Sequence, residues 1–229
     1  MVITLFIIPK KDHTVRFLTD LRELNKRIKR FPYLIPNIQE LLIKLEGFKW
    51  ATALNLNMGY YHIELSPDSK KLCSIVLPWG KYEYQVLPMG LSSIPDIFQE
   101  NMSNLFRDLE FVREYIDDLL ITTNRSLQDH LEKVEQVLKR LRKPGLKVNA
   151  NKSKFCRAEV EYLGYLITRE GIKPQAKKVQ ALHNMATPKT RRDLRKFLGL
   201  LNYYRDMTLR RSHTIAPLMK LTSDKVPFK

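Results

Sequence analysis

The sequence is poor in cysteine and contains no long apolar run. Its two cysteines, Cys73 and Cys156, lie far apart and outside any Cys-x-x-Cys pair, which argues against a disulfide framework and a structural zinc site. The five histidines show no metal-ligand spacing, and we expect His130, on a helical pattern, to be an ordinary surface residue. No apolar run approaches transmembrane length, and no signal peptide is visible. These absences predict a soluble, intracellular protein that does not enter a membrane.

Length, hydrophobic content and net charge restrict further what class of protein the chain can be. With 229 residues and 44% hydrophobic content, the chain can bury a substantial core, as one large domain or two small ones. The same content excludes general disorder. The 40 Lys and Arg residues against 24 Asp and Glu give a formal charge of +16. This excess favours a polyanionic partner, most simply nucleic acid, over a surface charged only for solubility.

The order of apolar patterns predicts strands mixed with packed helices, followed by a helical segment. This order is typical of an α+β domain with a helical appendage, and the change near residues 171–174 is the best candidate for a subdomain boundary. The expected strands cover residues 2–9, 14–18, 50–56, 71–77, 82–87, 160–163 and 165–168. The expected helices start at Asn37, near Pro95 and near Leu127, and two more carry Val179, Leu182 and Met185 and then Leu194, Phe197, Leu198 and Leu201.

The helix near Leu127 is expected to be amphipathic and to end at Pro144-Gly145. Its apolar stripe is expected to comprise Leu127, Leu131, Val134, Leu138 and Leu141.

Two adjacent carboxylates, Asp117 and Asp118, occupy one short segment between two apolar, β-prone runs. The pattern predicts two strands joined by a tight turn that carries both acids. Carboxylates crowded at the rim of a buried sheet are costly unless a cation offsets them, and their hard oxygens suit Mg²⁺ or Mn²⁺. The alternative is a solvated hairpin turn, which is common, and this segment alone does not decide between the two.

The segment Tyr115–Asp118, which reads Tyr-Ile-Asp-Asp, belongs to an ordered set of motifs. An earlier block, Ala53–Tyr61, ends an apolar strand just before Gly-Tyr, and the blocks Leu87–Gln99 and Tyr162–Gly164 precede and follow the paired acids. In this order the motifs resemble those of the reverse transcriptases of gypsy-type long-terminal-repeat retrotransposons. The resemblance runs from about residue 7 to residue 228, which is nearly the whole chain.

The resemblance implies the α+β fold of a right-hand polymerase. Residues 1–172 would form the palm with incomplete fingers, and residues 173–229 a helical thumb segment that leads toward an absent RNase H region. No protease, RNase H or integrase motif is visible. The chain therefore resembles a segment of a larger retroelement polyprotein, or a decayed copy read as a separate protein.

The chemistry implied by the resemblance is RNA-directed DNA synthesis from dNTPs, on an RNA template and a DNA primer. Two Mg²⁺ ions about 4 Å apart would activate the primer hydroxyl and stabilise the leaving oxygen. The family holds them with Asp117 and Asp118 of the turn and with an Asp at the end of the earlier strand, where this chain has Asn55. An amide keeps an oxygen acceptor but lacks the charge. We expect this change to lower the rate by at least ~10²–10³.

The resemblance also implies residues that bind the incoming dNTP. Lys10, Lys11 and Arg16 match basic finger residues that contact the triphosphate, although a basic loop tip explains the two lysines equally well. Tyr60 matches an aromatic residue beside the nucleotide sugar, with a core tyrosine as the alternative. In the block Leu87–Gln99, Met89 and Gly90 would lie nearest the substrate.

Two further sets would contact the primer and the nucleic-acid backbone. Tyr162, Leu163 and Gly164 resemble the hairpin that grips the primer end. Basic residues of the last helices lie largely off the apolar stripes, where a solvated helix face is the usual explanation and phosphate contact is at least as good a one. They are Lys177, Lys178, Arg191, Arg192, Arg195 and Lys196.

Two alternatives to an active polymerase stay open at the level of sequence. One is a non-catalytic nucleic-acid-binding remnant, and the other is a structural partner subunit of an active polymerase. Asn55 and the missing finger sequence favour the remnant over an active enzyme.

Overall fold

The computed structural model describes residues 5–9, 15–43, 45, 47–203, 207 and 211–228. The chain divides into two compact units, residues 1–160 and 161–229. Lys10 and Lys11 lie outside the described residues, and of Arg16 only the backbone is described. Within the described part of the chain, no helix is long and apolar enough to cross a membrane.

A four-stranded antiparallel sheet forms the centre of the first unit, with the strand order β6-β7-β3-β8. Its two inner strands are buried on both faces, since Ala51, Leu119, Leu120 and Ile121 are fully buried. A strand covered on both sides needs a continuous apolar run, and the sequence supplies one. The strands are β3 (Trp50–Asn55), β6 (Val112–Tyr115), β7 (Asp118–Thr123) and β8 (Lys154–Arg157).

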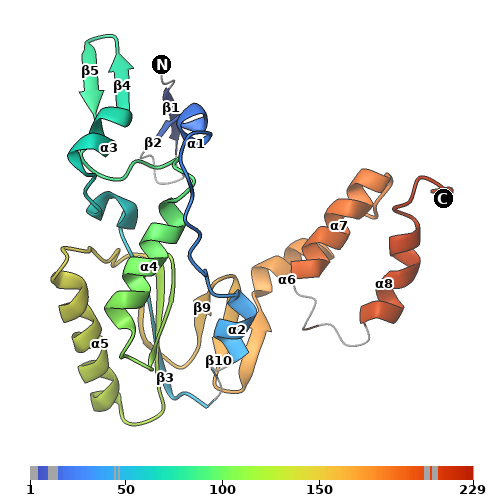
Figure 1. Cartoon of the computed structure of the whole chain (residues 1–229). Coiled ribbons are helices and arrows are strands. Elements are labelled where there is room, and N and C mark those ends of the chain that lie inside the picture. The colour runs from blue at the N-terminus through green and yellow to red at the C-terminus, as the bar shows by residue number, and fades with distance from the viewer. Residues whose placement is uncertain are drawn as a thin grey trace. The chain divides into compact units, whose positions relative to one another are not determined.

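Two long helices, α4 (Ile94–Phe106) and α5 (Leu127–Arg142), pack against this sheet (Figure 1). α4 contacts β6, and α5 contacts β3, β7 and β8. Together with the sheet they bury one apolar core. Its largest fully buried members are Leu54, Phe98, Met102, Leu119, Ile121 and Leu141.

The expected apolar stripe of α5 is confirmed at Val134 and Leu141, which are buried, and is wrong at its other three positions. Leu127, Leu131 and Leu138 are 41%, 45% and 37% exposed, whereas His130 and Val137 are fully buried. The helix is rotated toward His130, which we expected on the surface, because its ring finds two hydrogen-bond partners beneath the helix. The buried face of α5 therefore contains a polar residue beside Val134, Val137 and Leu141.

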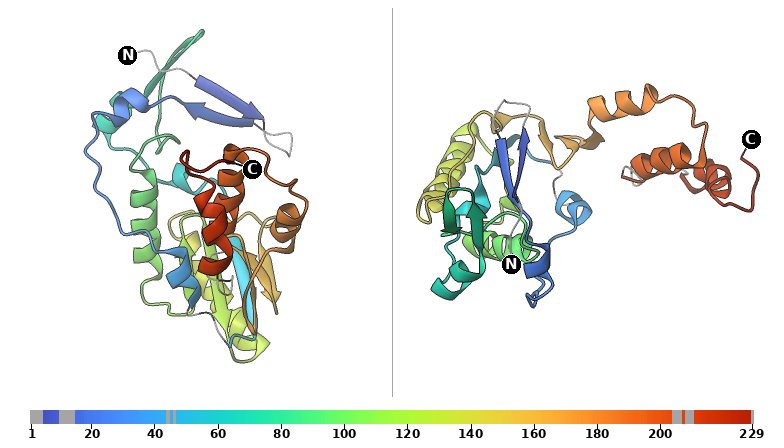
Figure 2. Two further views of the ribbon diagram at one scale, coloured as in Figure 1. Left: turned by 90° about the vertical axis from the view of Figure 1, so that its right-hand side faces the viewer. Right: turned by 90° about the horizontal axis from the view of Figure 1, so that it is seen from above.

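Two hairpins and several short helices complete the first unit, and Figures 1 and 2 place both hairpins at one end of it. β1 (Leu5–Pro9) and β2 (Val15–Thr19) pair antiparallel, as predicted. The expected strand at residues 71–77 begins only at Ser74, because Ser66 caps a short helix, α3 (Pro67–Leu72), that also includes Asp68. The other elements are α1 (Arg22–Asn25), α2 (Ile38–Ile43), η1 (Gly59–His62), β4 (Ser74–Leu77) and β5 (Gly80–Glu83).

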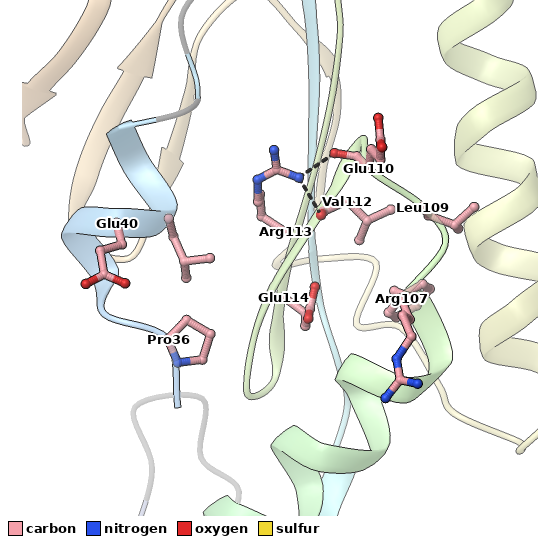
Figure 3. Close-up of a pocket in the computed structure, with 10 residues that line it drawn as sticks. Pro36, Glu40, Arg107, Leu109, Glu110, Val112, Arg113 and Glu114 are labelled. Carbon is pink, nitrogen blue, oxygen red and sulfur yellow. Dashed lines mark hydrogen bonds between the residues drawn. The ribbon is translucent and has the colours of Figure 1, made fainter. Parts of the chain in front are cut away.

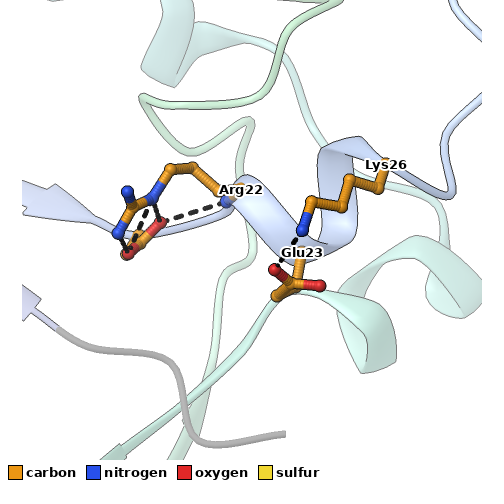
Figure 4. Close-up of polar contacts among 4 residues, drawn as sticks. Arg22, Glu23 and Lys26 are labelled. Atoms are coloured by element: carbon orange, nitrogen blue, oxygen red, sulfur yellow. Dashed lines mark hydrogen bonds and ion pairs between the residues drawn. The ribbon is translucent and has the colours of Figure 1, made fainter.

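Charged contacts fix the course of the chain around α1 and after it. Arg22 donates to the Asp20 carboxylate at 2.6 Å, and Lys26 donates to Glu23 at 2.6 Å (Figure 4). These pairs are exposed and contribute little to stability. A third pair is partly buried: Asp96 of α4, 1% exposed, accepts from the half-exposed Arg30 at 2.6 and 3.0 Å. This pair anchors the segment after α1 to the first turn of α4.

The second unit consists of a three-stranded sheet and three helices. The sheet order is β11-β10-β9, and the chain becomes helical directly after β11, where the sequence pattern changes. Leu194, Leu198 and Ile215 form a small core between the last two helices. Met185, expected on a helical stripe, lies beyond the end of α6 and is 37% exposed. The elements are β9 (Val160–Tyr162), β10 (Tyr165–Thr168), β11 (Gly171–Pro174), α6 (Ala176–His183), α7 (Arg191–Tyr203) and α8 (Arg211–Lys220).

Candidate active site

The paired acids lie on a two-residue hairpin turn between β6 and β7. Tyr115 pairs with Asp118, and Ile116 and Asp117 form the turn. Ile116 has a φ of 52°, a left-handed conformation that is costly for a β-branched side chain. The turn is therefore strained, and something outside it has to hold it in place.

Gln99 of α4 supplies that support. Its side chain is fully buried, and its Oε1 accepts the backbone N–H of Ile116 at 2.8 Å. Its Nε2 donates to Ser103 Oγ at 3.2 Å. Sequence reasoning missed this residue, although a Gln between the core residues Phe98 and Met102 was a visible departure from the apolar stripe. Gln99 fixes the turn that carries both carboxylates.

Asn55 lies directly beside the turn, as the order of the two motifs led us to expect. It is the last residue of β3, in register with Asp118, and its Nδ2 donates to Asp118 Oδ1 at 2.8 Å. A carboxylate can only accept, so the amide must present its N–H to it. The backbone N–H of Leu56 also donates to Asp117 O at 2.8 Å. The structure thus brings Asn55, Asp117 and Asp118 together.

In the part of the chain that the structure describes, one carboxylate oxygen of Asp117 is buried without a hydrogen bond or a positive charge to offset its burial. Among the described residues its Oδ1 is buried and has no hydrogen-bond partner. Burial, and then the negative charge of Asp118, raise the pKa of Asp117 from 3.8 to about 6. A Cβ at position 59 would lie 2.5 Å from this Oδ1 and 2.6 Å from Phe98 Cζ, so only Gly59 leaves room for it. An unpaired buried oxygen of this kind fits a cation.

The side chains at the turn meet only part of what a pair of divalent ions requires. Asp117 and Asp118 offer hard anionic oxygens, which suit Mg²⁺ or Mn²⁺. The third position holds an amide whose N–H points at Asp118. In the described part of the chain no three His, Cys, Asp or Glu side chains come together as a metal site. The residues therefore fit one divalent ion at the two carboxylates, and they lack the third carboxylate that a bridged pair needs.

Tyr60 has the core position that the sequence offered as the alternative to a place beside the nucleotide sugar. It lies in η1, packs against two core clusters, and its ring meets that of Phe98 edge-on at a centroid distance of 5.2 Å. Burial, and then the charge of Asp117, raise the pKa of its hydroxyl to about 12. The ring is thus a core element that also lies within electrostatic reach of the acidic turn.

The loop at Met89 and Gly90 is held by a residue that sequence reasoning missed. Asn25 Nδ2 donates to Gly90 O at 2.8 Å, and its Oδ1 accepts Ser92 N–H at 2.9 Å. Gly90 has a φ of 113°, and a Cβ there would lie 2.9 Å from Thr19 O. A single Asn at the end of a short helix gives no sequence signal, because its partners lie 65 residues away.

A separate cavity of about 800 Å³ lies beside β6, lined by α2, the end of α4 and the edge strand (Figure 3). Arg113 donates there to Val112 O at 2.9 Å and to Glu110 O. Burial raises the pKa of Glu114, which also lines it. None of the site residues expected from sequence borders this cavity, so it is not the candidate active site.

In the second unit, Leu163 and Gly164 form the two-residue turn between β9 and β10, with φ values of 46° and 82°. Tyr162 is 4% exposed. Of the basic residues, Arg191 donates to Val226 O at 2.7 Å and Arg195 to Thr222 O at 2.9 Å. The side chains of Lys177, Arg192 and Lys196 are exposed, and that of Lys178 lies over the ring of Tyr203.

Comparisons with known proteins agree with this geometry. Residues 8–167 match the reverse transcriptase (RNA-dependent DNA polymerase) family. The Transposon Tf2-3 and Tf2-7 polyproteins of Schizosaccharomyces pombe are each 32% identical to this chain over 224 residues, which are 97% of the chain and 17% of each polyprotein. The chain thus spans about a sixth of the length of these relatives.

The fold also matches solved structures. The foamy viral protease-reverse transcriptase in complex with dsDNA has a TM-score of 0.90 and 26% identity, over 96% of this chain and 46% of that one. The same viral protein in complex with an RNA/DNA hybrid gives a TM-score of 0.85 over 97% of this chain and 30% of that one. The predicted mixed α and β polymerase fold is confirmed. The chain therefore belongs to the reverse transcriptase family of RNA-directed DNA polymerases.

Proposed function

We propose that this chain contains finger, palm and thumb elements of a gypsy-type retroelement reverse transcriptase. The proposed parts are residues 1–172 for fingers and palm and 173–229 for the thumb segment. The relatives are polyproteins, which supports a place within a longer retroelement product. The observation that carries the proposal is the strand end at Asn55 beside the strained turn of Asp117 and Asp118.

The proposed reaction adds a dNTP to the 3′ end of a DNA primer on an RNA template. Reverse transcriptases use divalent metal ions, and when bound these would supply the charge that activates the hydroxyl and stabilises the leaving oxygen. Asp117 and Asp118 would hold one divalent ion, and Gln99 keeps both carboxylates in place through the turn. Tyr60 would border the nucleotide sugar, and the Met89–Gly90 loop, which Asn25 holds in place, would lie against the substrate.

We further propose that Asn55 impairs this copy in two ways. It removes one negative charge from the metal site, where preorganised electrostatics contribute ~10²–10³ or more to the rate. It also donates to Asp118 Oδ1, an oxygen that a metal ion would need. A cation at Asp118 must displace this hydrogen bond. The same contact favours the second candidate function, a non-catalytic nucleic-acid-binding remnant.

Primer extension on poly(rA) with an oligo(dT) primer tests the proposal. We compare the unmodified chain, Asn55→Asp and Asp117→Ala in Mg²⁺ and in Mn²⁺, and we measure metal affinity by calorimetry. The expected result is little or no extension by the unmodified chain and tighter Mg²⁺ binding by Asn55→Asp. Extension recovered by Asn55→Asp assigns the defect to this residue alone, whereas tighter binding without extension assigns it to the finger region. Robust extension by the unmodified chain, lost in Asp117→Ala, would show that two carboxylates suffice.

A further inference from the structure

The turn at Leu163 and Gly164 contains two consecutive left-handed residues, the conformation of a type I′ hairpin. Glycine adopts it without strain, but leucine does not. The turn is therefore held in shape at a cost, as at Ile116. As with Gln99 in the first unit, the support should come from a side chain outside the hairpin.

That support is Tyr203, the last residue of α7. Its hydroxyl donates to Leu163 O at 2.7 Å. In return, the hydroxyl of Tyr165 in β10 donates to Tyr203 O at 3.0 Å. The two rings stack with a centroid distance of 5.4 Å and an interplanar angle of 17°. The turn and the end of α7 are thus joined by two reciprocal hydrogen bonds and a stacked ring pair.

α6 joins the same contact through Lys178. Its Nζ lies 4.7 Å from the centroid of the Tyr203 ring, within the range of a cation–π interaction. Space at the turn is fully used: a Cβ at Gly164 would lie 2.6 Å from Tyr203 Oη and 2.8 Å from Lys178 Nζ. Gly164 is therefore required both by its φ of 82° and by the side chains that close over it.

Simple burial does not explain this arrangement. Tyr203 is 39% exposed, so its ring is not a core residue, yet its hydroxyl is directed at one turn carbonyl. An exposed tyrosine that holds a strained turn from the end of a helix links the position of that turn to the helix.

We propose that Tyr203 is a positioning residue that fixes the Leu163–Gly164 turn to α6 and α7, so that turn and helices contact the primer as one body. This inference rests on the proposed function, in which the turn grips the primer end and the helices follow the nucleic-acid backbone. Because the turn and the helices would move together, the position of the primer terminus would depend on how the thumb helices bind the duplex. Loss of the Tyr203 hydroxyl should therefore let the turn move independently of α6 and α7.

The test is a binding experiment, because it has to work whether or not this copy polymerises. Tyr203→Phe removes the hydroxyl and retains the ring over Lys178 and against Tyr165. We measure the affinity for an RNA–DNA duplex with a recessed primer end and for a blunt duplex of equal length. Hydroxyl-radical footprints report where the primer terminus lies. Tyr82→Phe, an exposed tyrosine on β5 of the first unit, is the matched control.

We expect Tyr203→Phe to weaken binding of the recessed duplex about 3- to 10-fold, the effect of one hydrogen bond, and to blur the footprint at the primer end. Binding of the blunt duplex and the melting temperature should stay close to those of Tyr82→Phe. Gly164→Ala disturbs the same contact, because the added Cβ would lie too close to Tyr203 Oη. It should make the footprint at the primer end less sharp in the same way. It keeps the test valid if Tyr203→Phe disturbs α7.

Two outcomes count against the inference and separate it from the proposed function. If the unmodified chain binds the recessed duplex and both variants give its unchanged footprint, Tyr203 has no positioning role, while the proposed function stands. If the unmodified chain binds neither duplex at low salt, the proposed function fails, and this inference fails with it.

Discussion

Two aspartates of the first unit, the buried Asp96 and the half-buried Asp117, have opposite surroundings. Asp96 accepts from Arg30 and from Tyr33 N–H, and the hydrogen bond from Arg30 is the largest cause that holds its pKa below the ordinary range. Asp117 has a buried oxygen without a partner among the described residues, and its pKa rises to about 6. Packing can satisfy a buried carboxylate, as Asp96 shows. The unsatisfied one therefore marks the place where a ligand is needed.

We predict that Asp117→Asn stabilises the protein at pH 7.5 by about 1–3 kcal/mol, since one pKa unit corresponds to about 1.4 kcal/mol and the side chain is partly solvated. The sign follows from linkage. The folded pKa of about 6 lies above the ordinary 3.8, so the folded state holds the proton more tightly between these values. Stability of the unmodified chain therefore falls as pH rises through this window, and the gain from Asp117→Asn vanishes near pH 4.

Urea denaturation at pH 4, 6 and 7.5 measures this difference. Asp96→Asn serves as the control and should destabilise, because it breaks the partly buried pair with Arg30. Added Mg²⁺ should stabilise the unmodified chain more than Asp117→Asn, since only the intact carboxylate attracts the ion. Equal stability of the unmodified chain and Asp117→Asn at every pH would contradict an uncompensated carboxylate at this position.

At the scale of elements, His130 connects α5 to the two inner strands of the sheet. Its Nε2 lies 2.8 Å from Thr52 Oγ1 of β3, and its Nδ1 lies 2.9 Å from Thr123 Oγ1 of β7. Thr52 Oγ1 also accepts Cys156 N–H of β8 at 3.1 Å. The ring therefore connects α5 with three adjacent strands of the sheet. Burial is the main cause that lowers the pKa of His130.

We predict that His130→Leu lowers the free energy of unfolding at pH 7.5 by about 1–3 kcal/mol, because two buried hydroxyls lose a partner. The pH dependence has the opposite sign to that of Asp117. A lowered folded pKa means that the unfolded chain takes up the proton first, so stability falls as pH drops below about 6.5. This loss should be absent in His130→Leu and retained in His183→Leu, whose side chain is exposed. A pH-dependent loss that survives in His130→Leu would rule out the buried imidazole as its source.

His130 also shows which parts of the structure the sequence could predict. The order of the motifs, in the family that they resemble, sufficed to predict that β3 lies beside the acidic turn. The orientation of α5 was predicted only in part: Val134 and Leu141 are buried as expected, whereas the burial of His130 depends on two threonines from distant strands. Asn25 and Gln99 were missed for the same reason: their partners are set by tertiary contacts.

At the scale of the whole molecule, a charge of +16 does not mean sixteen available cations. Many basic side chains already contact groups within the fold. In α7, Arg191 and Arg195 donate to carbonyls of the segment 222–226, and Lys196 lies 3.6 Å from Asp193. Exposed Lys177 and Arg192 have no hydrogen-bond or ion-pair partner in the part of the chain that the structure describes. Charge that is already engaged in the fold should contribute less to phosphate binding than exposed charge.

This distinction yields a prediction for the salt dependence of binding. An RNA–DNA duplex should bind with little sequence preference, and log K should fall with log[salt] by about 0.9 per phosphate neutralised on a B-form duplex. Lys177→Gln and Arg192→Gln should each reduce this slope by about 0.9, with no change in melting temperature. Arg195→Gln should instead lower the melting temperature and leave the slope almost unchanged, because its guanidinium holds Thr222 O. Filter binding from 50 to 300 mM salt measures the slopes. A full unit lost in Arg195→Gln, with unaltered stability, would show that Arg195 leaves the C-terminal segment for the phosphate backbone.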